Sequence, residues 1–243
     1  MEVKPYQVDG SKTQQVSKMF DNIAGKYDFL NHFLSLNMDK TWRRKMIAEL
    51  TILQPKSVLD VATGTGDVAI NTIKQLKIND LKIKGVDISA EMLNVGRAKI
   101  TKEGLSEKIQ LELGDSEQLP FEGNKFDAVT VAFGVRNFEN LERGLQEMHR
   151  VLRGGGKLVV LEFSKPTSFP FRQLYNFYFK NILPIIGKLT SKDNRAYTYL
   201  YESVQAFPDG DNFLTVLNKI GFKDTQCKPL TLGICSIYVG YKP

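Results

Sequence analysis

The stretch VLDVATGTGDVAI, residues 58–70, decides the fold of this chain. It predicts a buried strand that breaks into a glycine turn and continues as a helix, a layout that presents backbone N–H groups to a nucleotide-like ligand. Gly64, Gly66 and Ala69 fit the dinucleotide pattern G-x-G-x-x-A, and the same pattern with an acid at Asp60 also suits S-adenosylmethionine. These residues alone leave both ligands open.

The composition is that of an ordinary globular chain of 243 residues, enough for one sizeable domain. A net charge of +6 permits binding to nucleic acid or to an anionic membrane, but Lys and Arg are scattered without a dense basic tract, so no nucleic-acid partner is expected. Cys227 and Cys235 form no C-x-x-C pair, so we expect no metal site and a reducing compartment. Without a signal peptide or a spanning apolar run, the expected location is cytoplasmic.

Strands and helices alternate on the C-terminal side of the glycine turn. Ser89 is a good N-cap and Gly104 is a good helix stop, so the helix between them is well delimited. Because the strands are apolar on both faces and are separated by helix-length crossovers, we expect a parallel sheet covered on both sides. The expected strands cover residues 57–62, 81–87, 109–113, 126–132 and 157–163, and the expected helices cover 67–75, 90–102 and 141–152.

The two ends of the chain add helices and a hairpin. Apolar spacing predicts one or two helices over residues 16–36 and another over 39–50. A helix over 212–220 precedes strands over 222–227 and 234–240, which must pair antiparallel because their link is too short for a parallel crossover. A parallel sheet closed by an antiparallel hairpin is how the S-adenosylmethionine-dependent methyltransferase fold ends, and the nicotinamide-binding fold does not end this way.

Three acids follow successive strands at the edge where open α/β sheets bind ligands. Asp60 is placed to organise the glycine loop or to attract a cationic group, Asp87 to accept bonds from both ribose hydroxyls, and Asp115 or the backbone of Ser116 to meet an adenine edge. The alternatives are that the three acids cap a turn, pair with a surface lysine and sit in a turn, respectively. Because Asp60 and Asp67 bracket the glycines, a cationic ligand is favoured over a pyrophosphate.

Family resemblance runs through nearly the whole chain. The stretches that carry it are YDFLNHFLSLNMDKTWRRK (27–45), LDVATGTGD (59–67), VDIS (86–89), FGVRN (133–137) and FRQLYNFYFKNILPIIGKL (171–189). Together they resemble the ubiquinone/menaquinone biosynthesis C-methyltransferase family. The resemblance implies methyl transfer from S-adenosylmethionine to a ring carbon of a polyprenylated quinol. Demethylmenaquinol is the favoured acceptor, 2-methoxy-6-polyprenyl-1,4-benzoquinol is the alternative, and a nucleic-acid methyltransferase is the third interpretation.

The same resemblance implies the architecture. We expect an α/β class I methyltransferase Rossmann-like fold, with a mostly parallel seven-stranded sheet, a C-terminal antiparallel hairpin and helices on both faces. The chain is expected to form one domain over residues 1–243, with a helical cap over 1–54 and a helical substrate-covering insert over 164–209.

Cofactor contacts are expected around the glycine turn and after the next three strands. Some family members carry Ser where this chain has Ala132, so only a backbone contact is expected there. The full expected set is Asp60, Thr63, Gly64, Thr65, Gly66, Asp87, Ile88, Asp115, Ser116 and Ala132.

Catalytic candidates come from the two family-specific segments, because carbon methylation of a quinol requires a polar group that handles the ring hydroxyl. Arg136 is expected to stabilise the developing phenolate and Asn137 to orient it, while Tyr27, Asp28 or a water takes the proton. The alternative is that Arg136 pairs with an acid of a helix and that Tyr27 serves packing. His32 is a further candidate base, but a core or surface role is favoured for it.

The insert is rich in aromatic residues, which fits either plain core or a lid that passes an isoprenoid tail toward a bilayer. In the lid interpretation, basic residues lie on its polar side, and the protein makes peripheral contact with the inner face of the membrane. A homodimer is left open. The aromatic residues are Phe169, Phe171, Tyr175, Phe177, Tyr178 and Phe179, and the basic ones are Arg172, Lys180 and Lys188.

Overall fold

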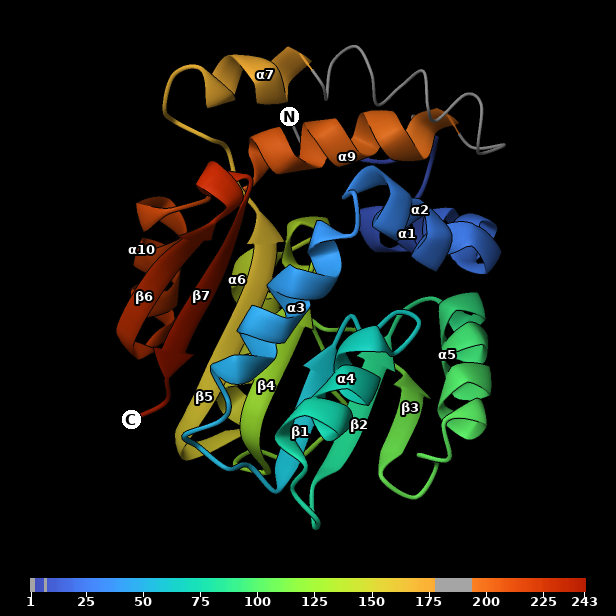
Figure 1. Ribbon diagram of the computed structural model, residues 1–243, viewed down its shortest axis with the longest axis vertical. Helices are drawn as coiled ribbons and strands as arrows, with labels where there is room; N and C mark the ends of the chain where they lie inside the picture. The colour runs from blue at the N-terminus through green and yellow to red at the C-terminus, as the bar shows by residue number, and fades with distance from the viewer. Residues whose placement is uncertain (1–2, 7, 178–193) are drawn as a thin grey trace.

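The computed structural model describes residues 3–6, 8–177 and 194–243. Its centre is a seven-stranded sheet in the order β3-β2-β1-β4-β5-β7-β6 (Figure 1). The first five strands are parallel and β7 runs antiparallel to both β5 and β6, which confirms the expected mostly parallel sheet with its C-terminal hairpin. The strands are β1 Ser57–Val61, β2 Lys82–Asp87, β3 Ile109–Leu113, β4 Phe126–Ala132, β5 Leu152–Phe163, β6 Lys223–Leu230 and β7 Cys235–Tyr241.

Helices cover both faces of the sheet (Figure 1). Consecutive residues of β1 show why its sequence is apolar throughout, because Val58 packs into the core on one face and Leu59 into the core on the other. The first core includes residues of α3 Met38–Ala48, α4 Asp67–Leu76 and α5 Ala90–Lys102, and the second includes residues of α6 Leu141–Val151 and α10 Asp211–Ile220.

The N-terminal segment divides between two locations. Helix α1 (Lys12–Ile23) begins four residues before the expected position 16, because Ser11 and Gln14 form a reciprocal capping box. A short 3-10 turn, η1 (Ala24–Lys26), joins it to α2 (Tyr27–Leu34), and these helices lie above the carboxyl ends of the strands (Figure 1). Helix α3 instead buries Trp42 on a face of the sheet, so the expected cap over residues 1–54 is reduced to α1 and α2.

The described part of the insert contains two helices. Helices α7 (Phe171–Phe177) and α9 (Asn194–Ala206) lie at the same end of the molecule as α1 and α2 (Figure 1). Tyr175 is buried, whereas Phe169 is 80% and Phe177 is 61% exposed, so plain core is the wrong interpretation for these two phenylalanines. The remaining expected residues of the insert, Tyr178, Phe179, Lys180 and Lys188, lie outside the described residues.

The strand order places a crevice between β1 and β4. Strands β2 and β3 lie on one side of β1, and β4 and β5 lie on its other side, so the chain reverses direction across the sheet at this point. Ligands of open α/β sheets bind outside the carboxyl ends of the strands at such a reversal. Among the described helices, none is long and apolar enough to cross a membrane.

Candidate functional site

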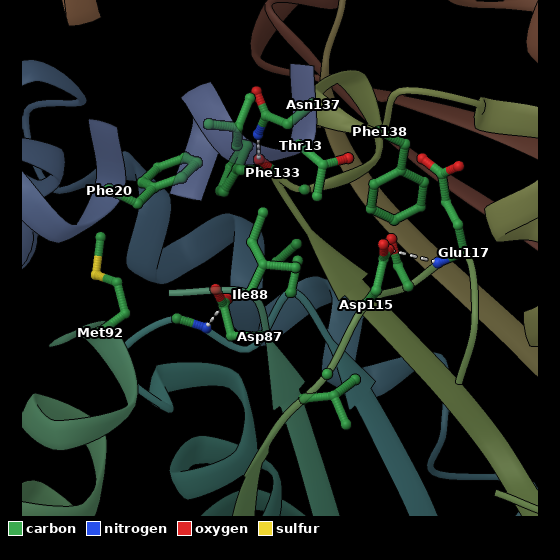
Figure 2. Close-up of a pocket in the computed structure, with 18 of the residues that line it drawn as sticks. Thr13, Phe20, Asp87, Ile88, Met92, Asp115, Glu117, Phe133, Asn137 and Phe138 are labelled. Carbon is green, nitrogen blue, oxygen red and sulfur yellow. Dashed lines mark hydrogen bonds between the residues drawn. The ribbon is translucent and has the colours of Figure 1, made fainter. Parts of the chain in front are cut away.

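A first cavity lies at the carboxyl ends of β1, β2, β3 and β4, and the side chains of Thr13, Val16 and Phe20 on α1 cover it (Figure 2). Six of the ten expected cofactor residues line this cavity, namely Gly64, Asp87, Ile88, Asp115, Ser116 and Ala132. The other four, Asp60, Thr63, Thr65 and Gly66, are not among the lining residues.

The backbone around the first cavity is held in unusual conformations. Gly64 and Gly66 have φ angles of +56° and +78°, the left-handed region that glycine adopts without steric cost. Ala62 and Phe133 adopt φ angles of +51° and +59° directly after β1 and β4. Each left-handed non-glycine residue costs about 1–3 kcal/mol, and such strain gathers at functional sites. The strain therefore agrees with a ligand site at this edge.

Asp87 is the central acid of the first cavity. Its carboxylate accepts hydrogen bonds from the backbone N–H groups of Gly64 at 2.8 Å and Ser89 at 2.9 Å, so pairing with a surface lysine is the wrong interpretation. Burial raises the pKa of Asp87 to about 6, although these hydrogen bonds act in the opposite direction. Asp115 lines the same cavity and lies on the other side of Ile88 in Figure 2. Asp115 also accepts a bond from the Glu117 backbone at 2.9 Å, as a turn residue does.

Asp60 does not line the first cavity and instead forms hydrogen bonds that hold the glycine turn. It is 1% exposed, and its two oxygens accept hydrogen bonds from the hydroxyls of Thr63 and Thr130, both at 2.6 Å. Burial raises the pKa of Asp60 to about 6. Of the two roles expected for Asp60, the structure therefore supports organisation of the glycine loop, because its oxygens are occupied within the protein.

A chain of polar contacts links α2 to the glycine turn. It includes two residues of the predicted site, Asp28 and Thr65. The Thr65 hydroxyl donates to Asp28 at 2.6 Å, and Lys99 on α5 donates to the other Asp28 oxygen at 2.7 Å. Lys99 also pairs with Asp67. Asp28 is not among the residues that line the two cavities, and the charge of Asp67 is paired with Lys99.

A second, larger cavity of about 490 Å³ adjoins the first. Its walls are mostly apolar and come from α1, α2, α3, α7 and α9 together with residues following β4 and β5. Three of the expected catalytic residues, Tyr27, Arg136 and Asn137, line it. The residues shared by the two cavities are Phe20, Tyr27, Phe133 and Asn137, so these side chains form a common wall.

Arg136 lines the second cavity and forms a buried ion pair. Its Nη1 lies 2.8 Å from Glu162, a residue of β5 with no exposed surface, so Arg136 does pair with an acid, but with one on a strand rather than a helix. The Glu162 carboxylate also accepts a bond from the Phe163 backbone at 2.9 Å. Burial raises the pKa of Glu162, although Arg136 acts in the opposite direction. The Arg136 Nε is buried and has no hydrogen-bond partner among the described residues.

Asn137 offers an unpaired acceptor beside this arginine. Its amide nitrogen donates to the Phe133 carbonyl at 3.4 Å, which turns its Oδ1 away from that carbonyl (Figure 2). The Oδ1 atom is buried and has no partner in the part of the chain that the structure describes. Two neighbouring residues of one cavity wall, Arg136 and Asn137, thus each keep a buried polar atom that no described residue satisfies.

Tyr27 belongs to the common wall of the two cavities. Burial raises the pKa of its phenol, and a hydrogen bond with Asn31 and the charges of Arg43 and Arg136 offset this only in part. The phenol therefore stays protonated at neutral pH.

Several lining residues escaped the sequence analysis. Thr13, Val16 and Phe20 reach the first cavity because α1 begins at the capping box, and that motif was the signal that would have placed the helix start. Asp39 and Arg43 line the second cavity, and their spacing of four residues on one helix is the only local sign that they act together.

Comparisons with known proteins agree on one family and one fold. The sequence model of the ubiE/COQ5 methyltransferase family matches residues 8–242 of this chain. A demethylmenaquinone methyltransferase of Bacteroides fragilis is 51% identical, covering 99% of this chain and 97% of that protein. A ubiquinone/menaquinone biosynthesis C-methyltransferase of Geotalea daltonii is 43% identical, covering 95% and 97%. The solved structure of a possible histamine N-methyltransferase of Thermotoga maritima aligns with a TM-score of 0.65 at 18% identity, covering 93% and 99%.

Proposed function

The chain belongs to the ubiE/COQ5 methyltransferase family, and on this premise we propose that it methylates a ring carbon of demethylmenaquinol with S-adenosylmethionine as donor. The observation that supports this most is the common wall, because it places a polar, acid-lined cavity directly against a large apolar one. The higher identity to a demethylmenaquinone methyltransferase than to the ubiquinone/menaquinone enzyme favours the naphthoquinol over the benzoquinol as acceptor.

The first cavity fits the donor chemically. Two carboxylates in one space suit ribose hydroxyls and a positively charged ligand and would repel a pyrophosphate. We assign the ribose to Asp87, the adenine to Asp115 and Ser116, and close backbone approach to Gly64. When bound there, S-adenosylmethionine supplies an electrophilic methyl group on its sulfonium.

Polar residues of the second cavity bind the hydroxyl of the acceptor and stabilise its charge. The Asn137 Oδ1 accepts a bond from the hydroxyl next to the reacting carbon, and the Arg136 guanidinium stabilises the negative charge that develops on that oxygen. Tyr27, protonated in the common wall, holds the ring in place by donating a hydrogen bond. A guanidinium is a poor base, so water takes the hydroxyl proton. The new carbon–carbon bond would form as the carbon–sulfur bond to the methyl group breaks, with S-adenosylhomocysteine as the leaving group. The methylated carbon would then give its own proton to water, which restores the aromatic ring.

A membrane is the proposed source of this substrate. Phe29 is 64%, Phe33 is 49% and Leu36 is 78% exposed, and the last two also line the second cavity. Phe177 is exposed on α7 at the same end of the molecule (Figure 1). An exposed apolar rim around an apolar cavity suits a bilayer surface from which a polyprenyl tail is drawn.

Vesicle sedimentation tests the membrane contact. Phe29→Asp is expected to lower binding to phosphatidylcholine and phosphatidylglycerol vesicles by about tenfold. The reason is that a charge replaces an apolar ring that is exposed in the free protein and inserts into the bilayer surface. Ile52→Asp is the control, since Ile52 is 96% exposed in the loop between α3 and β1, at the opposite edge of the sheet. Equal vesicle binding by the two variants would contradict the contact.

Methyl transfer is tested with purified protein and two reduced acceptors. Demethylmenaquinol is expected to be methylated, and 2-methoxy-6-polyprenyl-1,4-benzoquinol to react at a lower kcat/KM. S-adenosylhomocysteine should raise the melting temperature, and NAD should leave it unchanged. A product lacking a new carbon–methyl bond, or stabilisation by NAD alone, rules the proposal out.

A further inference from the structure

A second buried arginine in the larger cavity has no role in the chemistry described so far. Arg43 on α3 is 6% exposed and lines the cavity together with Asp39, its ion-pair partner one turn earlier on the same helix. Its Nε is buried and has no hydrogen-bond partner among the residues that the structure describes. Unpaired buried donors are rare in native proteins, and each needs an explanation.

The surroundings of Arg43 repeat those of Arg136. The Arg43 guanidinium lies 5.7 Å from the ring centre of Phe133, and the Arg136 guanidinium lies 5.5 Å from that of Phe163. The two rings are neighbours, with centroids 4.7 Å apart. Each arginine is held by a buried acid and keeps an unpaired Nε. One cavity wall therefore presents two separate cationic donors.

We propose that Arg43, oriented by Asp39, binds the second ring oxygen of the acceptor. This inference rests on the proposed function, in which Arg136 and Asn137 take the oxygen next to the reacting carbon. A 1,4-quinol carries its other oxygen on the opposite side of the ring, and Arg43 is the second arginine in the wall of the cavity that Arg136 lines. Held at both oxygens, the ring cannot rotate, so one particular carbon faces the common wall. Arg43 thus selects 1,4-dioxygenated rings over rings with a single hydroxyl.

A purely structural role accounts for only part of the geometry. Arg43 Nη1 pairs with Asp39 and lies 3.9 Å from Asp67, which explains that nitrogen and leaves Nε without a partner. Asp39 has further partners, since it accepts a bond from the Ser35 hydroxyl at 2.7 Å and lies 2.8 Å from His32 Nδ1. Replacement of Arg43 therefore leaves Asp39 held in place.

The test compares two acceptors in matched variants. One acceptor is 2-prenyl-1,4-naphthalenediol, and the other is 3-prenyl-1-naphthol, which keeps the hydroxyl next to the reacting carbon and lacks the second oxygen. Loss of that oxygen also changes ring reactivity, so the measured quantity is the diol-to-naphthol ratio of kcat/KM in each protein. The variants are Arg43→Met and the charge-neutral double variant Asp39→Asn/Arg43→Met. Arg44→Met is the control, because Arg44 is exposed on the same helix.

Arg43→Met and the double variant are expected to lower the ratio by about tenfold or more, and Arg44→Met to leave it unchanged. An equal loss with both acceptors would show a structural clamp and overturn the inference. If both Arg43 variants fail to fold, the test is the affinity of the wild-type protein, saturated with S-adenosylhomocysteine, for each of the two acceptors. The inference then requires the diol to bind at least about tenfold more tightly than the naphthol. Equal affinities overturn the inference. A wild-type protein that methylates neither acceptor refutes the proposed function itself.

Discussion

Removal of the Glu162 carboxylate is expected to destabilise the fold and to disable the site at once. Glu162 has no exposed surface and lies 2.8 Å from Arg136, so Glu162→Ala strands a guanidinium in the interior. Breaking a buried pair in this way costs about 3–5 kcal/mol. At about 2–4 °C per kcal/mol for a chain of this size, the melting temperature should fall by roughly 6–20 °C. Methyl transfer should fall as well, because Arg136 loses the group that orients it.

Two further variants and one control make this prediction specific. Glu162→Gln keeps an oxygen that accepts a hydrogen bond, so its cost should be smaller, about 1–3 kcal/mol. Combining Arg136→Met with Glu162→Leu removes both charges and should recover most of the stability without recovering activity. The control is Glu142→Ala, which breaks an exposed pair with Lys219 and should shift the melting temperature by less than about 2 °C. A Glu162→Ala melting temperature within about 2 °C of wild type, measured by scanning calorimetry, would refute the reasoning.

Three more outcomes are expected. The affinity for S-adenosylhomocysteine should weaken as the pH falls through about 6, because burial sets the pKa of Asp87 there and a protonated carboxyl loses acceptor capacity; titration calorimetry should find this dependence absent in Asp87→Asn. Tyr27→Phe should lower kcat by about tenfold or more, whereas Asp28→Asn should stay within about threefold, since only Tyr27 lines the cavities; comparable losses would contradict the assignment. Gly66→Ala should cost about 1–2 kcal/mol in chemical denaturation, because φ is +78° and the added Cβ meets no atom closer than 3.6 Å.

Sequence patterns predicted which segments form the strands and missed where some of the strands begin and end. Strand β5 begins at Leu152 rather than at position 157, because a bulge opposite β4 accommodates glycines that resemble a turn. The Cβ of any other residue at Gly156 would lie 2.8 Å from the Arg153 carbonyl, so glycine is required there. Strand β6 continues through Pro229, which resembles a break, because β6 is the edge strand and proline is tolerated at an edge.

The acids of the first cavity were predictable because they follow strands whose order is readable from the chain. The roles of residues on helices were less predictable from the sequence. Tyr27 and Asp28 are consecutive on α2 and therefore point about 100° apart, and only Tyr27 lines the cavities. Which of them does so depends on Lys99, whose contact with Asp28 spans 71 positions of the sequence. Arg43 was missed for a similar reason, since the Phe133 ring against which its guanidinium packs follows β4, far along the chain.

The donor cavity is built largely by loops of the sheet, whereas the acceptor cavity is built largely by helices from two segments that flank the α/β unit. Mutations in the insert can therefore reshape the proposed acceptor cavity without touching the glycine turn, because the insert residues line only the second cavity. A lineage of such proteins can change the molecule it modifies while inheriting the methyl source intact. The likeness to a possible histamine N-methyltransferase at only 18% identity shows how widely sequences diverge over this shared sheet.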